Sequence, residues 1–176
     1  MKLSPSMQKF VVHWGEMGSR WGVNRTVAQI HALLYLSEEP LTAEEIATTL
    51  GVARSNVSTS LKELISWGLV KTLHVLGDRR DHFESVKDVW DIFFLILEGR
   101  KRRELDPTLT TLRECVMESG NDQATDPAVK ARIQDTLEFM EQLTGWYGQM
   151  KELDRSTLLR VLKLGAKVQT LLGKSS

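Results

Sequence analysis

Residues 41–83, LTAEEIATTLGVARSNVSTSLKELISWGLVKTLHVLGDRRDHF, contain the strongest fold signals in the chain. This stretch begins with a capping box, because the Thr42 side chain can accept from the first turn of a helix while Glu45 reaches back to the backbone of Thr42. Leu41 and Ile46 occupy the two positions of a hydrophobic staple around the same turn. We therefore predict a helix that begins directly after Thr42.

The residues that follow predict a second helix and a hairpin. Gly51 supplies the left-handed residue that ends the first helix, and a second helix is expected over Ala53–Trp67. Two strands, Leu69–Leu76 and His82–Val86, are joined by a polar loop that contains Gly77. The order helix, turn, helix, strand, loop, strand describes a winged helix-turn-helix, a module that commonly binds DNA. The apolar residues expected to be buried in the second helix are Val57, Leu61, Leu64 and Ile65.

Apolar residues recur at helical spacing on both sides of this module, so the fold class is predicted as mainly α with a small β-hairpin. Residues 1–88 are expected to form the winged helix-turn-helix with an N-terminal helix. Residues 89–176 are expected to form a helical region that dimerises and is a possible effector site. In that region Asp106 and Pro107 either kink a helix or restart it, and Asp126 and Asp154 each cap a further helix.

The composition is that of an ordinary globular protein of 176 residues, 41% hydrophobic and 26% charged, with a formal net charge of zero. Residues 51–80 are locally basic, with five cations (Arg54, Lys62, Lys71, Arg79, Arg80) against two anions (Glu63, Asp78). The single cysteine excludes an intrachain disulfide, and we expect a cytoplasmic protein with no membrane partner because no signal peptide or long apolar run is present.

One side of the second helix carries short hydrogen-bonding side chains. A solvated helix surface is the plain alternative, but exposed helices favour Lys, Glu and Ala over Ser, Thr and Asn. Short polar groups suit the floor of the major groove. We predict that Ser55, Asn56 and Thr59 contact bases, whereas Arg54 and Lys62 are better placed for phosphates. Ser58 belongs to the same predicted DNA-binding face.

The loop between the two strands carries the adjacent arginines Arg79 and Arg80. By themselves they indicate a solvated turn, but two guanidinium groups at a hairpin tip can also enter a narrow minor groove, where the negative potential is enhanced. We predict the second role for both, with Asp78 or Asp81 holding one arginine in a fork-like ion pair.

Several segments resemble the GbsR-type branch of the MarR family of transcriptional regulators. The resemblance lies in residues 22–26 (GVNRT), 77–84 (GDRRDHFE), 87–90 (KDVW) and 102–109 (RRELDPTL). It implies a homodimeric, DNA-binding repressor or activator that dimerises through its N-terminal and C-terminal helices. Some members respond to osmoprotectants such as choline or betaine, which leaves the effector of this chain open. Relatives usually cap the recognition helix with Ser or Thr, whereas this chain has Ala53, so Ser55 is the alternative cap.

The leading hypothesis is a sequence-specific transcriptional regulator, with repression as the expected mode of action. It is expected to bind double-stranded DNA as a homodimer on a pseudo-palindromic operator. A winged-helix module that binds protein instead of DNA is the alternative, and a redox switch at Cys115 is a weaker one. No signature of catalysis, of a cofactor or of a metal site is present. Several aromatic residues are expected to be core, although they can also be read as a cage for a quaternary ammonium ligand: Trp14, Trp21, Trp90, Phe93, Phe94, Trp146 and Tyr147.

Overall fold

The computed structural model describes residues 2–172, with side chains up to residue 165; Met1 and residues 173–176, the end of the predicted second region, lie outside the described residues. The chain forms two compact units, Met1–Gly99 and Arg100–Ser176. The functional boundary expected at residue 88 stays a prediction, because compactness does not test which residues bind DNA and which dimerise.

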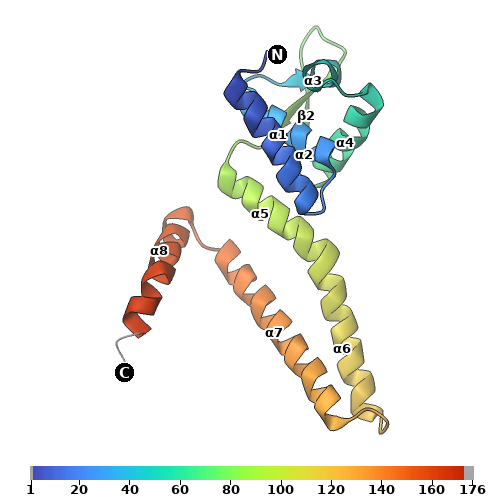
Figure 1. Ribbon diagram of the computed structural model, residues 1–176, viewed down its shortest axis with the longest axis vertical. Helices are drawn as coiled ribbons and strands as arrows, with labels where there is room; N and C mark the ends of the chain where they lie inside the picture. Colours follow the sequence, from blue (N-terminus) through green and yellow to red (C-terminus); the bar gives the residue numbers. More distant parts are fainter. Residues whose placement is uncertain (1, 173–176) are drawn as a thin grey trace. The chain divides into compact units, whose positions relative to one another are not determined.

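The first unit is helical with a small sheet, as predicted (Figure 1). The side chain of Ser4 accepts from the backbone N–H of Met7 at the start of its first helix, and the side chain of Asn24 accepts from Thr26 at the start of the second. Its elements are α1 (Pro5–Arg20), α2 (Arg25–Leu36), β1 (Leu41–Thr42), α3 (Ala43–Leu50), α4 (Arg54–Ser66), β2 (Val70–His74), β3 (Asp81–Ser85) and α5 (Val89–Arg100).

The sheet contains the predicted hairpin and one strand that the sequence did not indicate. Its order is β1-β3-β2, and β1 pairs antiparallel with β3 through Leu41↔Phe83. The strand predicted to reach Leu76 ends instead at His74, because a turn closed by a 3.0 Å hydrogen bond from Asp78 N–H to Val75 O begins there. Gly77 occupies that turn at φ 86°, a backbone conformation that favours glycine.

The core of the first unit lies between α2, α3, α4 and the sheet. Helices α1 and α2 also pack closely at Gly18. A Cβ atom added at this glycine would lie only 2.5 Å from the Cβ of Ala28. The largest fully buried apolar side chains are Ile30, Leu33, Leu34, Ile46, Leu61, Leu64, Leu69, Val27 and Val57.

The first unit also contains a buried histidine on α2. His31 is 3% exposed, and its Nε2 atom has no hydrogen-bond partner among the described residues. Burial lowers the pKa of His31 to about 4, with a smaller contribution from the charge of Lys87. The Lys87 ammonium donates to carbonyl oxygens at the end of α2, those of Leu34 at 2.6 Å, Tyr35 at 3.2 Å and Ser37. It therefore ties the segment after β3 to the C-terminus of α2.

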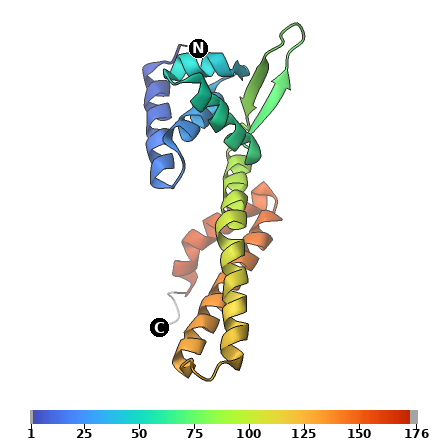
Figure 2. The same ribbon diagram turned by 90° about the vertical axis from the view of Figure 1, so that its right-hand side faces the viewer.

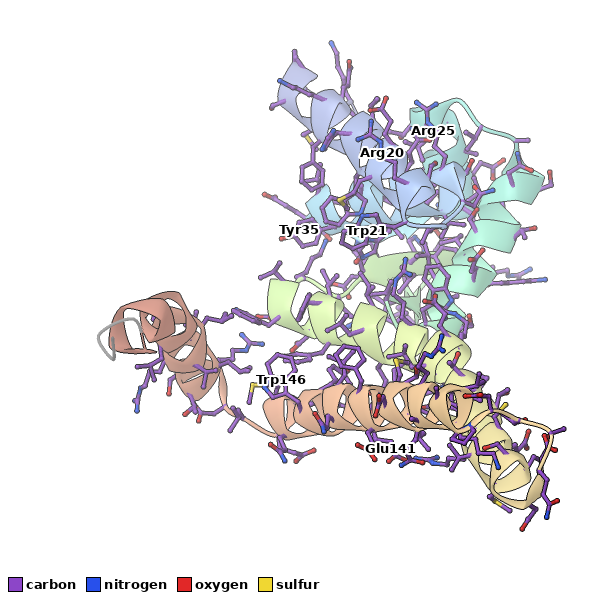
Figure 3. The ribbon with its side chains drawn as sticks, turned by 60° about the horizontal axis from the view of Figure 1, so that its bottom comes forward. Arg20, Trp21, Arg25, Tyr35, Glu141 and Trp146 are labelled. Carbon is purple, nitrogen blue, oxygen red and sulfur yellow. The ribbon has the colours of Figure 1, made fainter. Side chains whose placement is uncertain are left out.

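The aromatic side chains of this unit divide between core and surface. Phe10 stacks on Trp14 with ring centroids 5.3 Å apart and lies 6.3 Å from Tyr35, which Figure 3 labels. Trp21 is 59% exposed and Phe93 is 48% exposed, and Trp146 of the second unit is 57% exposed, so the core positions expected for these three residues are wrong. Whether the aromatics bind a ligand stays a hypothesis.

The second unit contains a pair of long helices that lie side by side in Figures 1 and 2. Asp126 and Asp154 cap helices as predicted, since each carboxylate accepts from the backbone of the following turn. An ion pair of 2.8 Å joins Arg113 to Glu141 across the two long helices. The elements are η1 (Lys101–Leu105), α6 (Asp106–Asn121), α7 (Pro127–Lys151) and α8 (Arg155–Leu172).

The helix around Pro107 does not restart with a cap at Asp106, so that alternative is wrong. A π-helical turn, η1, precedes the proline, and Asp106 has helical dihedral angles. Pro107 has no N–H to offer a carbonyl four residues earlier, and the wider turn accommodates this loss. The Asp106 carboxylate accepts from Lys101 at 2.7 Å instead of capping. None of the helices within the described residues combines the length and hydropathy needed to span a membrane.

We predict that His31 makes stability pH-dependent. The unfolded chain takes up a proton below the ordinary pKa of 6.5, whereas folded His31 resists protonation down to about pH 4. The His31 contribution to the free energy of unfolding should therefore be complete above pH 6.5. The free energy of unfolding should decline by about 3 kcal/mol as the pH falls to 4. Urea unfolding of wild type and His31→Leu across this range measures the effect, with His13→Gln, at an exposed site, as control. A decline equally steep in His31→Leu would contradict the assignment.

Candidate nucleic-acid interface

The first helix of the two-helix module begins where the capping box places it. The backbone N–H of Glu45 donates to the Thr42 hydroxyl at 3.3 Å, and the Thr42 N–H donates to the Glu45 carboxylate at 2.7 Å. These hydrogen bonds hold the pKa of Glu45 below its ordinary value. Gly51 ends the helix at φ 65° and ψ 34°, in the left-handed region. Both predicted ends of α3 are confirmed.

The second helix, α4, packs into the core through one apolar side. Val57, Leu61 and Leu64 are at most 2% exposed, as predicted. Ile65, expected to be buried, is 38% exposed, while Ser60 is buried at 5%. The buried strip is therefore turned slightly toward Ser60 relative to the prediction.

Five of the six candidate side chains on α4 lie together on its exposed side, and Ser58 is half-buried beside them. The Arg54 guanidinium donates to the Ser58 hydroxyl at 2.5 Å, and the Thr59 hydroxyl donates to the Ser55 carbonyl at 3.2 Å. Within the described part of the chain, the Asn56 amide and the Lys62 ammonium have no partner. The exposed candidates are Arg54, Ser55, Asn56, Thr59 and Lys62.

The start of α4 has the geometry of a capped helix but no capping side chain. Ala53 occupies the N-cap with φ −63° and ψ 140°, and no side chain accepts a hydrogen bond there. Ser55 lies inside the first turn, so the alternative that Ser55 caps the helix is wrong. The first N–H groups of α4 are therefore left for solvent or for an anion.

The hairpin β2–β3 projects from the helices of the first unit as a wing, with its loop at the far end (Figure 2). In the loop, Arg80 Nε lies 3.0 Å from both carboxylate oxygens of Asp78, and Nη2 lies 2.5 Å from one of them. This fork confirms that an acidic residue holds one of the two arginines. It keeps the pKa of Asp78 well below its ordinary value and raises that of Arg80. Asp81 lies across the hairpin, with a carboxylate oxygen 3.6 Å from Nδ1 of His74.

The two arginines of the loop differ in their surroundings. Arg80 lines a cleft together with Glu44 and Glu45 from the first turn of α3. Its positive charge is therefore balanced by three nearby carboxylates, those of Asp78, Glu44 and Glu45. Arg79 is exposed and has no side-chain partner among the described residues. Of the two loop arginines, Arg79 is therefore the one whose charge no described side chain balances.

Comparison with known proteins relates this module to a family. Residues 21–81 match the sequence profile of the MarR family. The HTH-type transcriptional regulator MmpR5 of Mycobacterium tuberculosis is 31% identical over 84 residues, which cover 47% of this chain and 51% of that protein. The HTH-type transcriptional repressor OpcR of Bacillus subtilis is 22% identical over 136 residues, which cover 76% of this chain and 74% of OpcR.

The fold agrees with these matches. The crystal structure of a transcriptional regulator superposes with a TM-score of 0.60 at 21% identity, covering 82% of this chain and 99% of that one. The likeness of residues 21–81 to the MarR family and the matches to curated regulators support a transcriptional regulator that binds DNA. The predicted fold class and the predicted regulatory function are confirmed at this level.

We predict that Ala53→Ser stabilises the protein. The N-cap dihedral angles already suit a serine, whose hydroxyl would accept from the first turn of α4. The free energy of unfolding should rise by about 1 kcal/mol in urea titrations. Ala53→Val, which brings no acceptor, is the control and should not stabilise. Equal stability of the serine and alanine proteins would mean that another group already satisfies these N–H donors.

Proposed function

We propose that this DNA-binding regulator recognises a pseudo-palindromic operator as a homodimer, with α4 in the major groove and the wing in the adjacent minor groove. The observation that carries the proposal is the exposed side of α4. Its direction is set by three buried side chains on the opposite side, and its Asn56 amide is free to bind.

Base contacts are assigned to three residues on α4. The Asn56 amide offers a donor and an acceptor side by side, which match N7 and N6 of adenine in the major groove. The Thr59 hydroxyl already donates to the Ser55 carbonyl, so its methyl group and lone pairs face the groove. A methyl group there suits the methyl of thymine. Ser55 adds a short hydroxyl near the helix start.

Phosphate contacts are assigned to Arg54 and Lys62, at the two ends of the exposed side. The hydrogen bond from Arg54 to Ser58 restricts the guanidinium, so Ser58 acts by positioning Arg54. The uncapped N–H groups behind Ala53 add donors toward the same phosphate. These contacts fix the position of the protein and do not read sequence.

The wing is assigned to the minor groove. Arg79 brings the uncompensated charge, and Arg80 is oriented by Asp78 through Nε and Nη2, which leaves Nη1 for the DNA. An arginine held in this way loses less conformational freedom on binding than a free one. The negative potential of a narrow A·T-rich groove favours both.

A second copy of the chain is the proposed partner of α7. This helix buries Leu137, yet three large apolar residues at steps of four and three remain exposed: Phe139 (63%), Leu143 (42%) and Trp146 (57%). Figure 3 shows Trp146 and Glu141 on different sides of α7. Contiguous exposed apolar surface of this kind typically marks an interface. Two copies would present two α4 helices about 34 Å apart, one turn of DNA.

Repression, membership of the GbsR-type branch and a cytoplasmic site of action are parts of the same proposal. The relative OpcR is described as a repressor, and the segments 77–84 and 87–90 carry the likeness to the branch. An effector that binds the helical region would act by changing the distance between the two α4 helices. Effector and DNA must then alter each other's affinity by the same factor.

We predict distinct effects for Asn56→Ala and Arg79→Ala. Losing a bidentate base contact should weaken binding to the operator by roughly 5- to 100-fold while random duplex is bound as before. Losing one groove-bound cation should reduce the slope of log affinity against log salt by about one. Fluorescence anisotropy with the upstream DNA of its own gene, or with a duplex selected from a random pool, measures both. Glu63→Gln, outside the proposed face, is the control.

Two outcomes would contradict the DNA proposal. One is wild-type protein that binds operator and random duplex equally with a steep salt dependence. The other is full regulatory activity in the double variant Arg79→Ala/Arg80→Ala together with loss of activity on changing exposed apolar residues. The second outcome would favour a module that binds protein.

We predict that Phe139→Glu/Trp146→Glu separates the dimer. Charge in an apolar contact costs desolvation on both copies, so sedimentation should show a monomer with unchanged helical circular dichroism. Operator affinity should fall as the second α4 is lost. Gln149→Glu places the same charge on α7 beside the stripe and should leave the dimer intact. A wild-type monomer at micromolar concentration would refute this interface.

A further inference from the structure

The tip of the wing carries an apolar side chain that the fold does not use. Leu76 has a relative exposure of 104%, as open to water as in an extended chain, and the neighbouring Val75 is 45% exposed. The turn they belong to depends on the Asp78–Val75 hydrogen bond and on Gly77. A leucine contributes nothing to either, so its apolar surface is exposed without any gain in stability.

The surroundings of Leu76 are those of a DNA contact. Three residues further on lies Arg79, the exposed arginine with no side-chain partner among the described residues. A protein partner that covered Leu76 would also have to desolvate this cation, whereas DNA supplies negative charge beside an apolar groove wall. Leucine is among the side chains that minor-groove proteins place against sugars or between base steps.

We propose that Leu76, flanked by Val75, is an apolar minor-groove contact of the wing, seated next to Arg79. The inference rests on the proposed function and adds a residue that acts by shape and not by charge. The side chain packs against the sugar edges and the groove floor. In a G·C pair the guanine amino group occupies that floor, and in an A·T pair it is absent. Leu76 therefore adds a preference for A·T pairs in the flanks of the operator.

The test compares Leu76→Ala with Leu76→Met, which keeps an apolar side chain of similar size. Because Leu76 is fully exposed, both variants should unfold at the wild-type urea concentration. Leu76→Ala should bind the selected duplex roughly tenfold more weakly, as expected for losing a buried apolar side chain. The slope of log affinity against log salt should stay unchanged, in contrast to Arg79→Ala. Leu76→Met should keep most of the affinity.

A second measurement addresses the groove directly. Flanking G·C pairs are replaced by inosine·C pairs, which lack the guanine amino group in the minor groove and keep the major-groove edge of the purine. Wild type should gain affinity on this replacement, and Leu76→Ala should gain less. Equal gains in the two proteins would overturn the minor-groove placement.

The possible failures are distinguishable. If Asn56→Ala weakens specific binding but Leu76→Ala does not, the inference about Leu76 fails and the proposed function stands. If wild type shows no sequence preference, the proposed function itself fails. If Leu76→Ala leaves DNA binding intact but changes the sedimentation of the protein, the tip contacts protein and the inference is overturned.

Discussion

Val57, Leu61 and Leu64 pack into the core of the first unit and thereby fix the orientation of α4. A helix advances about 100° per residue, so burial of one strip determines which side chains face solvent. A rotation by one residue in one direction would place the apolar Val57 where the exposed Asn56 now lies. The polar row of α4 is therefore a consequence of core packing, and the capping box of α3 supports it by starting the partner helix at a defined residue.

Charge is the second constraint, because the chain has no net charge to attract DNA over a distance. The local cations differ in whether a neighbouring side chain restrains them. Arg54 is restrained by Ser58 and Arg80 by Asp78, whereas Arg79 and Lys62 have no partner within the described residues. In the proposed dimer, affinity for DNA depends on well-placed contacts and on the second copy more than on long-range attraction by net charge. The apolar stripe on α7 is the proposed contact surface for the second copy.

Features set by neighbouring residues were predictable from the sequence. The capping box at Thr42, the left-handed end at Gly51 and the aspartate cap at Asp126 each involve groups no more than about four residues apart. Burial at the margins of α4 was not predictable in this way. Ser60 and Ile65 lie on opposite margins of the buried strip, and the neighbouring elements cover the serine instead of the more apolar isoleucine.

The order of the elements, most of their ends and the polar side chains on the exposed side of α4 follow from the sequence alone, because they depend on local hydrogen bonds and on helical spacing. Three features could be seen only in the folded chain: Leu41 pairs with Phe83, Asp78 and not Asp81 holds Arg80, and Leu76 lies beyond the strand in the tip of the wing. These choices depend on groups brought together across the sheet or by the geometry of a turn. The conformational preferences of single residues do not predict such contacts, because the contact energy is gained only when the two groups are brought together in the folded chain.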